Sequence, residues 1–135
     1  MATDDIGLAL ASLAAAYEQL DVNLADELEE QLFRPVQLAY GRARRIHAEF
    51  AGRHDLPVRS FEPASAGPPS TGAKGFIANA VTAVGRADAC LAELQDSLLP
   101  VEVGDADLRA GLADLRGLVG NLSQRAREVV RTIGR

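Results

Sequence analysis

The 135-residue sequence contains one cysteine, no tryptophan and only six aromatic residues. A single cysteine excludes a disulfide framework and any zinc site built on cysteines. The longest apolar stretch, Leu8–Tyr17, has ten residues, about half of the roughly 20 that a membrane-spanning helix requires. Asp4 and Asp5 stand where a secretory signal peptide carries positive charge. We therefore expect a cytoplasmic, soluble protein with no membrane partner, and residues 1–135 suffice for one domain with its own core.

Lysine is almost absent, because the 14 basic residues are 13 arginines and Lys74. Together with 24 alanines, this bias indicates GC-rich coding, so the number of arginines alone says little about function. Charge is distributed in blocks: residues 1–33 carry −8, residues 34–60 carry +4, residues 61–107 carry −5 and residues 108–135 carry +4. In an up-down-up-down bundle, each helix would then contact neighbours of opposite sign. The blocks indicate either partner specificity or solvated helix faces, whose ion pairs contribute about 0–1 kcal/mol each.

Apolar residues recur every three or four positions in two C-terminal segments, which is typical of helices that pack along their whole length. The last stripe consists of Leu108, Leu112, Leu115, Val119, Leu122, Ala126, Val129 and Ile133. The preceding stripe consists of Ile77, Ala80, Val84, Ala87, Leu91, Leu94 and Leu98. Pro100 ends the helix that carries the stripe from Ile77 to Leu98. Gly104 with Asp105 supplies an N-cap for the helix that carries the last stripe.

The N-terminal part has a longer stripe, made of Ile6, Leu10, Leu13, Tyr17, Leu20 and Leu24. Leu28 and Leu32 then follow at spacings of four, which moves the stripe round the helix, and it resumes from Val36 to Phe50. A break is possible at Asn23, which could cap a new helix, or at Pro35. We predict a helix over about 4–33, a kink or break at Pro35, and a helix to about 52. The expected fold is all-α: an antiparallel bundle of three long helices, the first kinked or split near Pro35, so that four segments are counted.

Residues 53–75 have no apolar period and contain four prolines and three glycines. A loop of this length inside a compact domain is uncommon and is usually functional or disordered.

Arg42 and His47 fit an Arg-x4-His spacing, which resembles the motif of HEPN domains over these six residues. The resemblance implies a small helical domain that dimerises and cleaves RNA, with the histidine assisting proton transfer and the arginine holding the phosphate. The alternative is that His47, next to the apolar stripe, is a half-buried structural residue.

Acidic residues offer a further pattern, because Asp26, Glu27 and Glu30, with Glu93 and Asp96 downstream, resemble the magnesium-binding motifs of all-α nucleotide pyrophosphohydrolases. With Leu24 and Leu28 in the core, however, Glu30 points away from the bundle. No Glu-x-x-His occurs, which excludes a ferritin-like di-iron site. We expect no cofactor and no metal.

No credible catalytic set emerges, so we expect a non-enzymatic helical interaction module, namely a small adaptor, a scaffold or a subunit of a larger complex. Its partner is another protein or a second copy of the chain in a homo-oligomer. The alternative function is a HEPN-like ribonuclease that uses Arg42 and His47, and nucleic acid binding is a further possibility because arginines cluster over residues 42–59. The candidate partner-binding residues are Arg42, Arg44, Arg45, Arg53, Arg59 and Lys74.

Overall fold

A computed structural model describes residues 2–57, 64–97 and 104–133. Its elements are α1 (Ala2–Gln19), α2 (Val22–Leu28), the π-helical turn η1 (Glu29–Phe33), α3 (Arg34–Arg53), the 3₁₀ turn η2 (Pro69–Thr71), α4 (Gly72–Asp96) and α6 (Ala106–Ile133). No β-strand occurs in the three described ranges, so the predicted all-α fold is confirmed. Because α2, η1 and α3 follow one another without interruption, we refer to them together as the α2–α3 helix.

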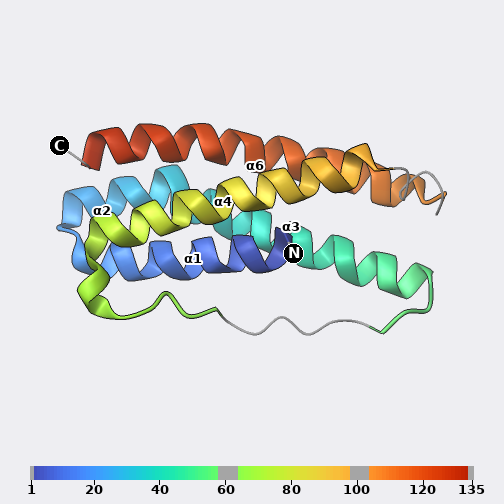
Figure 1. Ribbon diagram of the computed structural model, residues 1–135, viewed down its shortest axis with the longest axis horizontal. Helices are drawn as coiled ribbons and strands as arrows, with labels where there is room; N and C mark the ends of the chain where they lie inside the picture. The colour runs from blue at the N-terminus through green and yellow to red at the C-terminus, as the bar shows by residue number, and fades with distance from the viewer. Residues whose placement is uncertain (1, 58–63, 98–103, 134–135) are drawn as a thin grey trace.

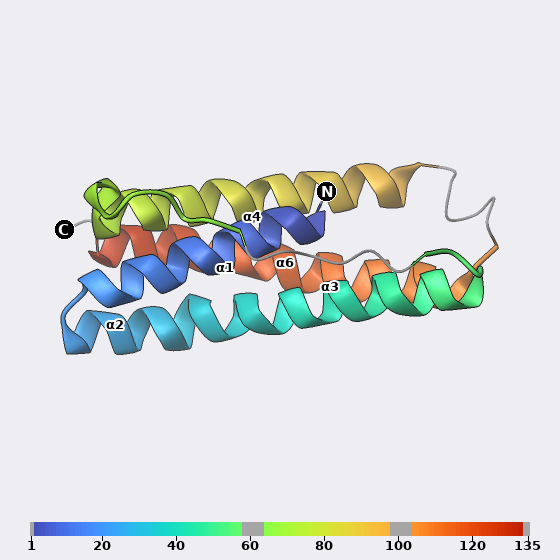
Figure 2. The same cartoon turned by 90° about the horizontal axis from the view of Figure 1, so that it is seen from below.

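The helices form a bundle in which sequence neighbours are not always spatial neighbours (Figure 1). The α1 helix runs antiparallel to the α2–α3 helix, and the connection after α3 returns along the bundle so that α4 starts at the same end as α2, on the opposite side of the bundle (Figures 1 and 2). The α6 helix then runs back antiparallel to α4. Both α1 and α6 pack against α3 and against α4. All packed neighbours are therefore antiparallel, and the long connection joins two parallel helices, as in bundles with one crossover.

The first break in the chain lies at Leu20–Asp21, between α1 and α2. The Asp21 side chain caps α2, since its Oδ1 accepts a hydrogen bond of 2.9 Å from the backbone N–H of Leu24. A carboxylate in this position satisfies a backbone donor that has no partner within the helix. The predicted uninterrupted helix over 4–33 is therefore wrong: the chain reverses two residues before Asn23, and the described residues form a bundle of four helices.

At Pro35 the helix continues instead of breaking, and the π-helical turn η1 directly precedes it. The spacing Leu24–Leu28–Leu32–Val36 explains this turn, because each step of four residues advances about 40° round an α-helix. A wider turn, in which the backbone N–H of Arg34 bonds to the carbonyl of Glu29, removes that drift. As a result Leu28, Leu32 and Val36 are all at most 1% exposed. Of the predicted kink or break at Pro35, the break does not occur, and a local change of helix type precedes the proline.

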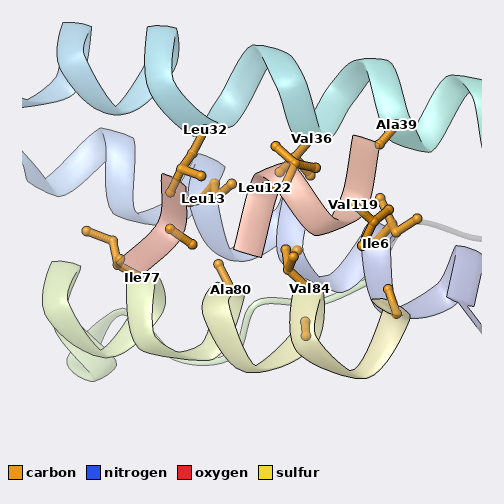
Figure 3. Close-up of a cluster of buried hydrophobic side chains, with 14 of the residues drawn as sticks. Ile6, Leu13, Leu32, Val36, Ala39, Ile77, Ala80, Val84, Val119 and Leu122 are labelled. Atoms are coloured by element: carbon orange, nitrogen blue, oxygen red, sulfur yellow. The ribbon is translucent and has the colours of Figure 1, made fainter. Parts of the chain in front are cut away.

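The core draws on α1, the α2–α3 helix, α4 and α6 (Figure 3). Most residues of the two C-terminal stripes are buried as predicted, although Leu94 is exposed and Leu98 lies outside the described residues. In α1 the prediction is wrong at Tyr17, which is 38% exposed. Three small residues of α1 are instead fully buried: Ala9, Ser12 and Ala16. The α1 helix packs most extensively against α4, which also buries alanines, and small side chains allow two helices to approach closely.

The irregular connection is shorter than predicted, because α3 includes Arg53 and the η2 turn leads into α4 at Gly72. The α3 helix ends in a Schellman motif, in which the N–H of Leu56 bonds to the carbonyl of Ala51 at 2.8 Å and Asp55 adopts a φ of 53°.

The C-terminal part of the same connection contacts the bundle. Ala66 packs against the core, and Nε2 of Gln19 donates a hydrogen bond of 2.9 Å to the carbonyl of Pro69.

The expected alternation of charge between packed helices holds for only half of the contacts. Arg34–Arg53 carries +4 and packs against Ala106–Ile133, which carries +2. Ala2–Gln19 carries −3 and packs against Gly72–Asp96, which carries −1. The expectation assumed an up-down-up-down order, whereas the crossover places α1 beside α4 and α3 beside α6. Basic helices therefore share one side of the bundle.

Candidate partner-binding surface

Four candidate arginines lie on α3, and the three within residues 42–45 have different surroundings. Arg42 forms an ion pair and a hydrogen bond with Asp114 of α6, so it helps to hold the bundle together. The guanidinium of Arg44 lies 5.6 Å from the centre of the Tyr40 ring, within the range of a cation–π contact. Arg45 is exposed and makes no ion pair in the described part of the chain. Of the three, Arg45 is therefore the one with its charge fully available to a partner.

Arg53 is part of a small polar cluster between the end of α3 and the start of α6. Its Nε donates a hydrogen bond of 2.9 Å to Oδ2 of Asp105, and Nε2 of His54 lies 2.9 Å from the same oxygen. The side chain of Asp105 is only 5% exposed. Its other oxygen, Oδ1, accepts the backbone N–H of Leu108 at 2.8 Å, which confirms the predicted N-cap. Arg53 therefore joins two helices of its own chain.

Electrostatics in this cluster follow from the hydrogen bonds. The hydrogen bond from Arg53, followed by that from the Leu108 N–H, holds the pKa of Asp105 well below its usual range despite the opposing effect of burial. The same hydrogen bond to Asp105 raises the pKa of Arg53. The His54 ring also packs against Phe50, with ring centres 4.5 Å apart. Three side chains, those of Arg53, His54 and Asp105, therefore join the C-terminal end of α3 to the N-terminal end of α6.

The remaining two candidates are not brought to these arginines. Lys74 is exposed in the first turn of α4, at the opposite end of the bundle from Arg53 (Figure 1). Arg59 lies outside the described residues. The six candidate residues thus do not form one continuous surface.

The acidic residues that resemble a magnesium motif are also separated. Asp26, Glu27 and Glu30 belong to α2 and η1 at one end of the bundle, whereas Glu93 and Asp96 lie near the opposite end, where α4 finishes (Figure 1). Over the described ranges, no group of three or more His, Cys, Asp or Glu side chains is placed to hold a metal ion.

A surface that we did not predict runs along the outside of the α2–α3 helix, which forms one edge of the bundle in Figure 2. We call it the outer face, and its residues are Asp26, Glu30, Arg34, Leu38, Gly41, Arg45, Ala48 and Gly52, all of them exposed. The signal for it is present in the sequence. Leu28, Leu32 and Val36 face the core. The residue two positions after each of them lies about 200° round the helix and therefore faces away from the core. Leu38, which is 51% exposed, is the one large apolar residue of this face.

A polar groove of about 430 Å³, which the sequence does not predict, lies between α4 and α6. Asp88 and Glu128 line it together with Arg127 and Arg131, so its charges balance.

None of the described helices has both the length and the apolar character needed to cross a membrane. Comparison with known proteins yields no match to a protein-family model, to a curated protein or to a solved structure.

Proposed function

We propose that this protein is a non-enzymatic helical interaction module, acting in the cytoplasm as a small adaptor, a scaffold or a subunit of a larger complex. One observation supports the proposal: the outer face carries charged groups that the chain itself leaves unmatched. Asp26, Glu30 and Arg45 are exposed and make no ion pair with any described residue. By contrast, Arg42 and Arg53 form ion pairs with aspartates of their own chain.

An exposed ion pair contributes only about 0–1 kcal/mol to stability. A surface charge that is left unpaired therefore costs the fold little. They have larger effects on association, where complementary charges accelerate encounter and reject wrong partners. Leu38 lies among these charges and supplies an apolar contact of the kind that lies at the centre of an interface. A rigid helix that presents both features over its length is suited to binding another protein surface.

The proposal is tested by photo-cross-linking in cells of the source organism. A photoreactive residue replaces Ala48, an uncharged residue of the outer face, and the control carries it at Gly117 of α6, where a Cβ meets no other atom within 4 Å. We expect a covalent adduct with a defined protein, or with a second copy of the chain, from position 48 and not from position 117. The binding of that protein in purified form should then weaken with Arg45→Glu. Equal labelling at both positions, or none at either, would contradict the proposal.

The ribonuclease alternative requires Arg42 and His47 to meet in a common cleft. Five residues of α-helix separate their side chains by about 140°. Arg42 reaches Asp114 of α6, while atom Nε2 of His47 is buried. The two side chains therefore have different surroundings, and an assay for RNA cleavage distinguishes this alternative from the interaction module.

A further inference from the structure

The outer face of the α2–α3 helix has opposite charges in its two halves. Its N-terminal half presents Asp26 and Glu30, and its C-terminal half presents Arg45. The whole helix follows the same division, since residues 22–33 carry four acidic and no basic residues, whereas residues 34–53 carry five basic residues and one acidic residue. Figure 2 shows no described segment on the outer side of this helix. We propose that the outer face binds a second copy of this chain in an antiparallel, two-fold symmetric pair centred near Leu38.

A second copy is the occupant that the charges favour. When two identical helices with one acidic and one basic half lie antiparallel, each acidic half faces the basic half of its partner. In a parallel arrangement, like charges would face each other along the whole length. A partner of a single charge, such as an acidic peptide, would match one half and be repelled by the other. The inference rests on the proposed function, because it identifies the partner of the same surface.

The register follows from the positions of the exposed side chains. Glu30 lies eight residues before Leu38, and Arg45 lies seven residues after it, which corresponds to about 12 Å and about 10 Å along an α-helix. A two-fold axis close to Leu38 therefore places Glu30 of one protomer opposite Arg45 of its partner, and the reverse pair forms by symmetry. The two Leu38 side chains meet at the axis.

The same register sets the neighbours of the remaining outer-face residues. Arg34 comes opposite Gly41, where a side chain on α3 would meet no atom within 4 Å. The long arginine side chain thus has free space beside the partner's backbone, and its own exposed pairing with Glu29 neutralises its charge. Asp26 comes opposite Glu49, the one acidic residue of 34–53, next to the small side chain of Ala48. This like-charged pair lies about 17 Å from the axis, at the exposed ends of the contact, and it weakens the interface without changing the register.

An interface of this kind is modest and electrostatic. Exposed ion pairs are screened by salt, since the Debye length falls from about 10 Å at 0.1 M to about 3 Å at 1 M ionic strength. We therefore expect dimerisation that is measurable at low salt and high protein concentration, and that weakens as salt is added. Analytical ultracentrifugation of the full chain over a range of protein and salt concentrations measures this directly.

Charge reversal provides the decisive experiment. Glu30→Arg alone places two arginines opposite each other at both contacts, and Arg45→Glu alone places two glutamates there, so each variant should dimerise on the order of tenfold more weakly. An equimolar mixture of the two variants restores both ion pairs in a heterodimer, and the double variant Glu30→Arg/Arg45→Glu restores them in a homodimer. Matched controls are Glu18→Arg on α1 and Arg86→Glu on α4, which are exposed and should leave dimerisation unchanged.

Disulfide trapping tests the position of the two-fold axis. In a Cys90→Ala background, Leu38→Cys should form a covalent dimer on mild oxidation, whereas Gly117→Cys should not. Circular dichroism verifies that each variant is folded, which is expected because all substituted outer-face residues are exposed.

The inference would be overturned by a chain that stays monomeric at low salt, or by dimerisation that Glu30→Arg and Arg45→Glu do not weaken or their mixture does not restore. A monomeric chain that still cross-links to a different protein from position 48 overturns the homodimer alone and leaves the interaction module in place. A monomer without any adduct overturns both.

Discussion

Arg53 and Asp105 are 52 residues apart in the chain, yet Nε of Arg53 donates a hydrogen bond of 2.9 Å to Oδ2 of Asp105. The contact joins the last residue of α3 to the N-cap of α6. The α1 helix does not extend to this end of the bundle (Figure 1), so fewer helices pack together there. The charged cluster in this position adds a contact between α3 and α6 and caps the first turn of α6.

Acidification should reveal the contribution of Asp105. Because the pKa of Asp105 is lower in the folded chain than the value of about 3.9 expected when unfolded, its stabilising effect is present above about pH 4 and is lost as the pH falls further. We expect Asp105→Asn to lower the urea midpoint at neutral pH and to flatten the fall in stability between about pH 5 and about pH 2. Urea titrations at several pH values measure both effects. Asp107→Asn in the same turn is the control, and identical pH profiles for the wild type and Asp105→Asn would contradict the expectation.

Two glycines of α6 should respond differently to alanine. At Gly111, a new Cβ would lie 3.2 Å from Cγ1 of Ile46, whose branched side chain has little rotational freedom in a helix. At Gly117, a new Cβ meets nothing within 4 Å. We expect Gly117→Ala to raise the free energy of unfolding by about 1 kcal/mol through helix propensity. The free energy of unfolding of Gly111→Ala should be at least about 1 kcal/mol lower than that of Gly117→Ala, because the new Cβ is crowded by Ile46. Equal effects in thermal or urea denaturation would show that Ile46 moves aside without cost.

Ser12 is a site where a smaller side chain should stabilise the protein. Its side chain is fully buried, and Oγ has no hydrogen-bond partner among the described residues. Removing an unsatisfied buried hydroxyl and introducing a better helix former should raise the free energy of unfolding by about 1 kcal/mol in Ser12→Ala. Differential scanning calorimetry would detect this as a higher Tm, and a lower Tm would show that the hydroxyl is satisfied in solution.

Asp55 terminates α3 with a φ of 53°, a backbone conformation that favours glycine. Asp55→Gly should therefore raise the free energy of unfolding by about 0.5–1 kcal/mol. Asp55→Ala should lower it, because alanine has neither the freedom of glycine nor the polar side chain of aspartate. Urea denaturation of the three proteins provides the ranking, and a glycine variant that is less stable than the alanine variant would contradict it.

RNA provides the test between the two functional hypotheses. We expect the purified chain to leave single-stranded RNA intact, and His47→Ala to change nothing in the assay, because an interaction module has no catalytic group. Gel analysis of a labelled RNA over time is sufficient. Cleavage by the wild type that disappears in His47→Ala and in Arg42→Ala would establish the ribonuclease instead.

Part of the candidate surface was accessible from the sequence, because exposure on a helix follows from the positions of its buried residues. The residues of α3 that include Arg45 were predicted as candidates, and Arg45 is exposed without an internal partner. The different roles of Arg42 and Arg53 could not be predicted. Their acidic partners, Asp114 and Asp105, follow 72 and 52 residues later, and no periodicity relates such distant positions.

By itself, the sequence determined the helical class, most of the buried face of each helix and the N-cap at Asp105, since apolar spacing and capping are local properties of the chain. The spacing of four residues through Leu24, Leu28 and Leu32 also contained the signal of the π-helical turn. Only the tertiary structure decided that α1 lies against α4, and α3 against α6. An apolar stripe requires burial without specifying its neighbour, so the order of packing depends on the connections and on how closely small residues let helices approach. That order placed the basic helices together and left the outer face of the α2–α3 helix at the edge of the bundle.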